Sequence, residues 1–341
     1  MTRVRWGVLS TARIGRVVAR ACRDSHSADF VAVASRDGER ARQFADQEGM
    51  PLSFGSYEEL LACDAVDAVY IALPVSMHAE WTVRALAAGK DVLCEKPMSA
   101  SSAKVEACFD AAERSGRQCF EGLMYRHHPQ TRLVGRMVAD GDIGQLTLVR
   151  AVLSVSVGEH DIRRSPTLDG GALNDLGCYC VSAIRLFAGR PLSIQAEQVQ
   201  AGGVDLRLAA TLRMRGDVLG LFDIGLDLPR REELELVGTT GRIVVRDPWL
   251  CRLPNIELWR DGDMEVVAVD PDGAFCLAHD DSDAYRIEFD TISSAILGGA
   301  RRRSAGRTLS SRLRCWRPSG APPASADVDT TRSSGLRIHL S

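Results

Sequence analysis

Lysine is nearly absent from this chain of 341 residues, since only three of its 42 basic residues are lysines, at positions 90, 96 and 104. Long apolar runs are absent too. No stretch approaches the roughly 20 apolar residues of a transmembrane helix, and the N-terminal segment shows no signal-peptide pattern. The net charge of -3 at pH 7 argues against a nucleic acid or a membrane as the main partner.

The ten cysteines do not form a metal-binding pattern. The closest pair, Cys178 and Cys180, has neither zinc-type spacing nor a second pair. His78, His127 and His128 likewise have no carboxylate or cysteine partner at ligand spacing. We therefore expect reduced thiols, no metal site and a cytoplasmic location.

Strand-like and helix-like segments alternate over the first 120 residues. Five apolar or β-branched runs predict strands, at residues 5–9, 30–34, 68–73, 91–93 and 118–120. Strands separated by helical segments are typical of right-handed βαβ crossovers and a parallel sheet. We predict a doubly wound α/β domain of the Rossmann type over residues 1–122.

The sequence becomes rich in strands after residue 122. Alternating or β-branched runs predict strands at residues 146–157, 204–214, 218–226, 233–237, 243–245 and 265–269. This pattern predicts an α+β domain over residues 123–299, with a large, mostly antiparallel open sheet. Because one face of such a sheet needs covering, we expect a homodimer or homotetramer formed through it.

Residues 300–341 differ in composition from the rest of the chain. They carry nine arginines and two acids, a net charge of +7, which leaves -10 for the first 299 residues. No helical or strand period is evident there, so a disordered basic tail is one interpretation and a nucleic-acid-binding arm is a weaker one. A third interpretation is a shift of the reading frame near residue 300, because one back-translation in a shifted frame gives an amphipathic helix.

The first predicted strand leads into a candidate phosphate-binding turn. A G-x-G-x-x-G pattern placed on this turn falls on Ser10, Thr11, Ala12, Arg13, Ile14 and Gly15, where only the last glycine remains. Small residues still allow the backbone to approach a pyrophosphate in front of a helix N-terminus. An ordinary structural turn is the alternative.

The end of the second predicted strand bears on the choice between NAD and NADP. An acidic residue there would bind the ribose 2′-hydroxyl of NAD, but the sequence has Ser35 followed by Arg36. A hydroxyl and a guanidinium suit the 2′-phosphate of NADP. Asp37 lies two positions beyond the expected acidic site and is interpreted as a helix cap. We therefore predict NADP, with NAD as the alternative.

Lys96 directly follows a short apolar strand and precedes Pro97. A charged pair such as Glu95 and Lys96 is costly at the end of a buried strand unless a ligand uses it. In an open α/β sheet, ligands bind at this edge. The alternative is a structural ion pair that caps the next helix.

A second candidate cluster follows the glycine pair Gly170 and Gly171. Asp175 and Tyr179 stand four residues apart, so on a helix they share one face. A carboxylate and a phenol in this arrangement could orient a sugar hydroxyl and move its proton. The alternative is an aspartate favoured by the helix dipole beside a tyrosine of the core.

Taken together, these motifs resemble the glucose–fructose oxidoreductase/inositol dehydrogenase (Gfo/Idh/MocA) family, from about Val4 to Gly299. Its markers here are the turn at residues 7–15, Pro74 with residues 78–81, residues 95–97, residues 124–129, and residues 170–179. The resemblance implies a Rossmann domain followed by an α/β domain with an oligomerising sheet. It also implies hydride transfer between NAD(P) and a hydroxyl- or carbonyl-bearing carbon, usually of a sugar, without a metal.

The resemblance implies three groups of site residues. The catalytic group is Lys96, Tyr179 and Asp175. The cofactor-binding group is Ser10, Thr11, Ala12, Arg13, Ile14, Ser35, Arg36, Leu73, Pro74, His78, Glu95 and Lys96. The substrate-binding group is Tyr125, Arg126, Asp161 and Arg163.

A tyrosine at position 179, where many family members have histidine, is similar to the branch of NADP-linked xylose dehydrogenases, dihydrodiol dehydrogenases and glucose–fructose oxidoreductase. Nucleotide-sugar 3-ketoreductases share the stretch at residues 127–130, so they are the first alternative, and a non-catalytic NADP-binding sensor is another. We expect Tyr179 to exchange the proton. Lys96 would lower its pKa by roughly 3 units, about 4 kcal/mol, which a cation ~4 Å away can supply.

Overall fold

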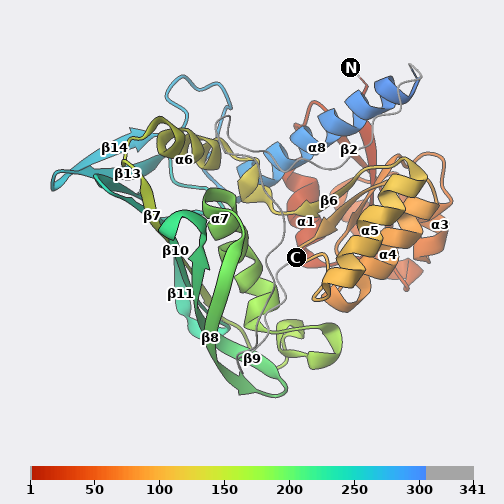
Figure 1. Cartoon of the computed structure of the whole chain (residues 1–341). Helices are drawn as coiled ribbons and strands as arrows, with labels where there is room; N and C mark the ends of the chain where they lie inside the picture. The colour runs from red at the N-terminus through yellow and green to blue at the C-terminus, as the bar shows by residue number, and fades with distance from the viewer. Residues whose placement is uncertain (1, 305–341) are drawn as a thin grey trace.

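The chain folds around two β-sheets, each covered by helices, and a long C-terminal helix runs back from the second sheet to the first (Figure 1). This computed structural model describes the backbone of residues 2–304 and the side chains of residues 2–299. We call the first sheet and its helices the first domain, and the second sheet and its helices the second domain.

The first sheet is parallel and has the order β3-β2-β1-β4-β5-β6. This order confirms the doubly wound prediction. Its strands are β1 (Val4–Leu9), β2 (Ala28–Ala34), β3 (Leu52–Phe54), β4 (Ala68–Ile71), β5 (Asp91–Glu95) and β6 (Cys119–Gly122). The helices between them are α1 (Arg13–Ala21), α2 (Gly38–Glu48), α3 (Tyr57–Leu61), α4 (Val75–Ala87) and α5 (Ser102–Ser115).

Burial and capping explain why these segments form where they do. Strand β4 is buried at every position, as expected for a central parallel strand covered on both faces. Helix α2 begins after Asp37, whose carboxylate accepts from the backbone N–H groups of Glu39 and Arg40. This confirms that Asp37 is a helix cap. The helix ends at Gly49 in the left-handed conformation.

The second sheet has eight strands in the order β14-β13-β12-β11-β7-β10-β9-β8. Only β7 and β10 pair in parallel; the other neighbours are antiparallel, so the prediction of a mostly antiparallel open sheet is confirmed. Its strands are β7 (Leu146–Ser156), β8 (Pro191–Ala201), β9 (Val204–Met214), β10 (Leu219–Gly225), β11 (Asp227–Gly238), β12 (Gly241–Val245), β13 (Asn255–Arg260) and β14 (Asp263–Ala268).

Helices α6 (Pro129–Asp140) and α7 (Cys178–Ala188) belong to the second domain, and α7 packs on one face of its sheet (Figure 1). Strand β9 shows strict alternation of buried and more exposed residues, as one covered and one open face require. Short helical turns complete the domain: η1 (Met124–Arg126), η2 (Ile162–Arg164), η3 (Pro166–Leu168), η4 (Leu173–Gly177) and η5 (Arg215–Asp217).

Helix α8 (Asp281–Ser304) was not identified from the sequence. It packs against α1, β1 and β2 of the first domain. Its Phe289 ring lies 4.9 Å from that of Trp6, and the Trp6 indole N–H donates to the hydroxyl of Ser293 at 3.0 Å. The helix extends to residue 304. Its last residues thus lie within residues 300–341, where the sequence shows no evident helical period. The remainder of the tail, with its proposed shift of reading frame, lies outside the described residues.

No helix among residues 2–304 is both long enough and apolar enough to cross a membrane.

Candidate active site

The carboxyl ends of β1 and β2 form the edge where the sequence predicts a dinucleotide. Ser10 has φ 115°, a conformation that normally favours glycine, and its hydroxyl accepts from the Ala12 N–H at 3.0 Å. No side chain caps α1, which begins at Arg13 and continues with Ile14. The Gly15 N–H donates to the Ala12 carbonyl, so the N–H groups of Arg13 and Ile14 are the ones at this end that an anion could use, as a phosphate-binding turn requires.

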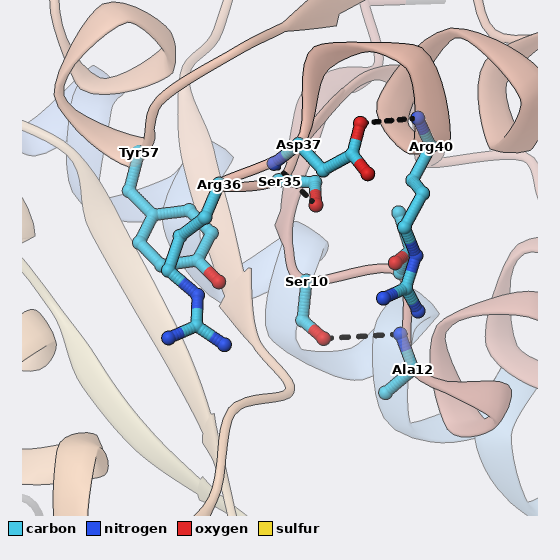
Figure 2. Close-up of a pocket in the computed structure, with 8 residues that line it drawn as sticks. Ser10, Ala12, Ser35, Arg36, Asp37, Arg40 and Tyr57 are labelled. Carbon is cyan, nitrogen blue, oxygen red and sulfur yellow. Dashed lines mark hydrogen bonds between the residues drawn. The ribbon is translucent and has the colours of Figure 1, made fainter.

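A pocket opens at this edge (Figure 2). Arg36, which was predicted to bind cofactor, and Arg40, which was not, extend their guanidinium groups on either side of Ser10 in that view. Arg40 is three residues beyond the helix cap Asp37, so it projects from the first turn of α2; this spacing is the signal that could have identified it. The residues that line the pocket are Ser10, Thr11, Ala12, Ser35, Arg36, Asp37, Arg40 and Tyr57. Two cations beside a free helix N-terminus fit a phosphorylated dinucleotide.

Lys96 reaches from the first domain to the second. Its ammonium group donates to both the carbonyl oxygen and the carboxylate Oδ1 of Asp175, each at 2.8 Å. The two side chains are only 14% and 20% exposed. Burial alone would lower the pKa of Lys96, but the opposing charge of Asp175 prevails and raises it above its usual value. Lys96 is therefore a fixed cation at neutral pH.

The same ammonium lies over the face of the Tyr179 ring, 4.9 Å from its centroid. It does not approach the hydroxyl, which instead points to the sulfur of Met124 at 3.6 Å. Burial raises the pKa of Tyr179 well above its usual value. Our expectation of a lowered pKa for Tyr179 is therefore not met in this structure, because burial is the largest influence and the charges of Glu95 and Asp175 act in the same direction.

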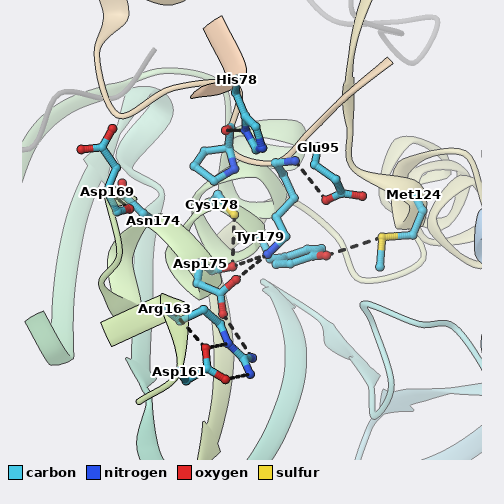
Figure 3. A network of polar contacts seen from close by, with 12 residues as sticks. His78, Glu95, Met124, Asp161, Arg163, Asp169, Asn174, Asp175, Cys178 and Tyr179 are labelled. Atoms are coloured by element: carbon cyan, nitrogen blue, oxygen red, sulfur yellow. Dashed lines mark hydrogen bonds and ion pairs between the residues drawn. The ribbon is translucent and has the colours of Figure 1, made fainter. Parts of the chain in front are cut away.

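Asp175 is also the centre of a longer chain of charges, and Figure 3 shows it between Tyr179 and Arg163. The Arg163 Nη1 lies 3.7 Å from Asp175 Oδ2. The rest of that guanidinium binds Asp161 through two contacts of 2.8 Å. Two cations and two carboxylates thus alternate along one side of the site.

The backbone around Asp175 is unusual. Residues Leu173–Gly177 form a π-helical turn, in which the N–H of Cys178 bonds to the carbonyl of Leu173, five residues back. Such turns widen a helix by one residue and are frequent at functional sites. Asp175 and Tyr179 therefore share the continuous helix expected from their spacing, but across a widened turn.

Glu95 lies beside Lys96 at the end of β5 and is partly buried. Its carboxylate accepts from the Tyr70 hydroxyl and, at 3.1 Å, from the backbone N–H of Lys96. Burial is the largest influence on its pKa, which is raised. Glu95 thus holds the segment that carries Lys96.

His78, Leu73 and Pro74 lie at the neighbouring strand end. The His78 ring is 1% exposed, and its two nitrogens face the carbonyl oxygens of Leu73 at 2.7 Å and Pro97 at 2.8 Å. Burial lowers the pKa of His78, and a neutral ring donates to only one of these carbonyls. His78 thus ties the end of β4 to the turn after Lys96.

Tyr125 and Arg126, both predicted to bind substrate, differ from each other in burial. Tyr125 is buried, and its hydroxyl donates to Ser182 at 2.8 Å, so its side chain does not face the open side of the site. Arg126 is partly exposed. The Trp249 ring, which the sequence gave no reason to select, lies 5.4 Å from Tyr125 and 5.6 Å from Tyr179. It forms part of the apolar wall behind the phenol.

Within residues 2–304, no three histidine, cysteine, aspartate or glutamate side chains gather in a way that would hold a metal ion.

Two family models match the chain. One is described as an oxidoreductase family with an NAD-binding Rossmann fold and covers residues 4–123; the other is the GFO/IDH/MocA C-terminal domain and covers residues 131–244.

Individual relatives extend this similarity over most of the chain. D-xylose 1-dehydrogenase (NADP(+)) 2 from Haloferax volcanii is 35% identical over 86% of this chain and 89% of its own length. The dTDP-3,4-didehydro-2,6-dideoxy-alpha-D-glucose 3-reductase from Saccharopolyspora spinosa is 36% identical over 71% of this chain and 74% of its own.

Among solved structures, the 3-ketoreductase KijD10 from Actinomadura kijaniata, in complex with NADP and TDP-benzene, superposes with a TM-score of 0.77. It is 30% identical and covers 87% of this chain and 90% of its own. Sequence motifs, fold and relatives agree: the chain belongs to the Gfo/Idh/MocA family and is an NAD(P)-dependent oxidoreductase.

Proposed function

We propose that this protein is an NADP-dependent sugar dehydrogenase, acting most readily on a free aldose of the xylose type. The observation that carries the proposal is the buried Lys96–Asp175 pair next to Tyr179. A protein that only sensed NADP would have no need for this pair, because its cost in desolvation is justified only by a task in the site.

The preference for NADP rests on the pocket at the end of β2. Ser35, Arg36 and Arg40 present one hydroxyl and two guanidinium groups there. A ribose 2′-phosphate would be bound by paired, charge-assisted hydrogen bonds from these groups. The carboxylate of Asp37, which would otherwise favour NAD, is occupied by the start of α2.

Tyr179, Lys96 and Asp175 would together control the transfer of the proton to or from the substrate oxygen. When bound, the nicotinamide supplies or accepts the hydride. Tyr179 carries its phenolic proton in this structure, where burial raises its pKa, so the phenol becomes an effective proton donor to a carbonyl oxygen only when that pKa is brought down toward neutrality. In oxidation Tyr179 must accept that proton, and this requires the Lys96 ammonium to turn from the ring face toward the hydroxyl. Asp175 anchors Lys96 in its present position and orients the substrate hydroxyl beside it.

Charge balance favours a free sugar over a nucleotide-linked one. Lys96 and Arg163 are matched by Asp161 and Asp175 through the contacts described above, so neither of these two cations is left free for a diphosphate. The alternative, a nucleotide-sugar 3-ketoreductase, draws support from the Saccharopolyspora relative and the KijD10 structure.

The first experiment follows reduced-nicotinamide absorbance with NADP or NAD across free aldoses, trans-dihydrodiols and a dTDP-linked ketosugar. Lys96→Ala is measured beside Lys104→Ala, a matched control on the exposed face of α5. We expect turnover of an aldose with NADP that is lost in Lys96→Ala and kept in Lys104→Ala. Turnover of the dTDP-sugar alone would select the ketoreductase, and activity retained in Lys96→Ala would refute the catalytic role.

We also propose that the open face of the second sheet joins two or four copies of the chain. Val199 and Leu219 lie on that face and are 49% and 42% exposed. Size-exclusion chromatography with light scattering tests the assembly, and a shift to monomer in Val199→Arg/Leu219→Arg would support the face as the interface.

A further inference from the structure

Asp205 is not one of the alternating cations and carboxylates of the site. Its carboxylate is nevertheless linked to Asp175 through backbone hydrogen bonds. It projects from β9, near the edge of the second sheet. Its Oδ2 accepts from the N–H of Leu173 at 2.7 Å. Leu173 is the first residue of the π-helical turn, so Asp205 binds the start of the segment that carries Asp175.

The glycine pair before this turn is shaped by the same carboxylate. Gly171 has φ +121°, and a Cβ at this position would lie 2.2 Å from Asp205 Oδ1. Asp205 therefore occupies the space that a side chain at position 171 would need. The contact therefore needs both a glycine at position 171 and the carboxylate of Asp205.

The other side of the pair is held by the loop that carries Arg163. The Gly171 N–H donates to the Arg163 carbonyl at 2.8 Å, and the Gly170 N–H donates to the Ser165 carbonyl at 2.9 Å. A Cβ on Gly170 would lie 2.6 Å from that same Arg163 carbonyl. The turn is clamped between this loop and β9.

These contacts hold the backbone only a few residues before the catalytic residue Asp175. The Asp175 N–H donates to the Gly171 carbonyl at 3.0 Å, and Asp175 in turn receives Lys96 through its carbonyl and carboxylate. A shift of the turn would move both acceptors together and release the ammonium. Burial is the largest influence on the pKa of Asp205 and raises it, so the carboxyl is held there at some cost.

We propose that Asp205 is a positioning residue of the active site: by fixing the first residue of the π-helical turn, it places Asp175 and so sets the direction of Lys96. The catalytic part of this inference rests on the proposed function. The positioning part is independent of it, because it concerns contacts within the chain.

The test compares three variants. Asp205→Ala removes the acceptor, and Asp205→Asn keeps an oxygen that can accept from Leu173. Asp227→Ala is the control, since Asp227 also binds a residue of β9, Arg207, at 3.0 Å, but does not touch the turn. We expect Asp205→Ala to lower kcat by roughly tenfold to a hundredfold, with the KM for NADP within about threefold, because small displacements of catalytic groups cost this much. Asp205→Asn should recover most of kcat, and Asp227→Ala should retain it.

A second readout does not depend on activity. Because the chain has only three lysines, ¹⁵N-lysine NMR resolves the Lys96 ammonium, assigned by its loss in Lys96→Ala, against Lys90 and Lys104. The Lys96 signal should move in Asp205→Ala and remain in Asp205→Asn and Asp227→Ala. Should the alanine variant fail to fold, Asp205→Leu, which fills the space without an acceptor, replaces it.

A Lys96 signal and a kcat unchanged in Asp205→Ala would overturn the inference, as would equal effects in Asp227→Ala. Wild-type protein that turns over no sugar while its Lys96 signal still moves in Asp205→Ala would refute the proposed function alone.

Discussion

Glu288 on α8 offers a test of the buried electrostatics that needs no substrate. The side chain is 2% exposed, and its Oε1 has no hydrogen-bond partner. Its carboxyl does accept from the Leu123 N–H, but burial and the neighbouring charge of Glu95 raise its pKa well above the ordinary value of 4.5. Burial thus favours the neutral acid of Glu288 in the folded protein, and glutamine would reproduce its shape and its neutral state.

The effect of Glu288→Gln on stability should grow with pH. A raised folded-state pKa means that the contribution of the acid is fully present below its unfolded pKa and is lost as pH rises toward the folded value. Glutamine has no proton to retain, so the variant should gain up to about 1.4 kcal/mol per pH unit over the wild type as the pH rises from the unfolded toward the folded pKa of Glu288. Between pH 5 and pH 7 the difference in unfolding free energy should thus increase, by at most about 2.7 kcal/mol.

Urea denaturation at pH 5, 6 and 7 measures this difference. Glu106→Gln, on the exposed side of α5, is the control for removing a surface carboxylate. A difference between Glu288→Gln and wild type that stays constant across these pH values would show that Glu288 is ionised in the folded state, and would refute the reasoning.

Two further predictions concern the cofactor pocket and the histidines after β6. Arg40→Ala should weaken NADP binding by roughly tenfold, leave NAD binding unchanged, and reduce the salt dependence of the NADP Kd; calorimetry at two salt concentrations measures this, and equal losses for NAD and NADP would contradict it. Burial lowers the pKa of both His127 and His128 to about 4, so both rings should stay neutral from pH 5.5 to pH 8. Long-range ¹H–¹⁵N NMR of the rings reports this directly, and a titration step near pH 6.5 would be the contrary result.

The sequence predicts the central strands of the first domain well, because burial on both faces leaves continuous apolar runs such as β4 and β5. It misses β3, which has only three residues, β8, whose edge position allows mostly polar residues, and β13. Helix α8 was missed because its inward face contacts a different domain from the one it follows in sequence.

The sequence predicts which residues form the site but not the directions in which their side chains point. Lys96, Asp175 and Tyr179 do come together, since strand ends and glycine turns are visible in the sequence. The direction of the Lys96 ammonium depends on a competition between the Asp175 carboxylate and the phenol, and no sequence pattern indicates its outcome. Asp205 acts through backbone contacts and leaves no motif, whereas Arg40 is indicated only by its spacing from the helix cap Asp37.

The π-helical turn at Leu173–Gly177 makes the site depend on residue count. Each residue of an α-helix advances the chain by about 100°, so the deletion of Leu176 or Gly177, which lie between Asp175 and Tyr179, would rotate Asp175 relative to Tyr179 by about that angle. Tyr179 would stay in its place on α7, whereas Asp175 would turn away from Lys96. The residues between Asp175 and Tyr179 can therefore be substituted with less effect on the site than a change in their number would have.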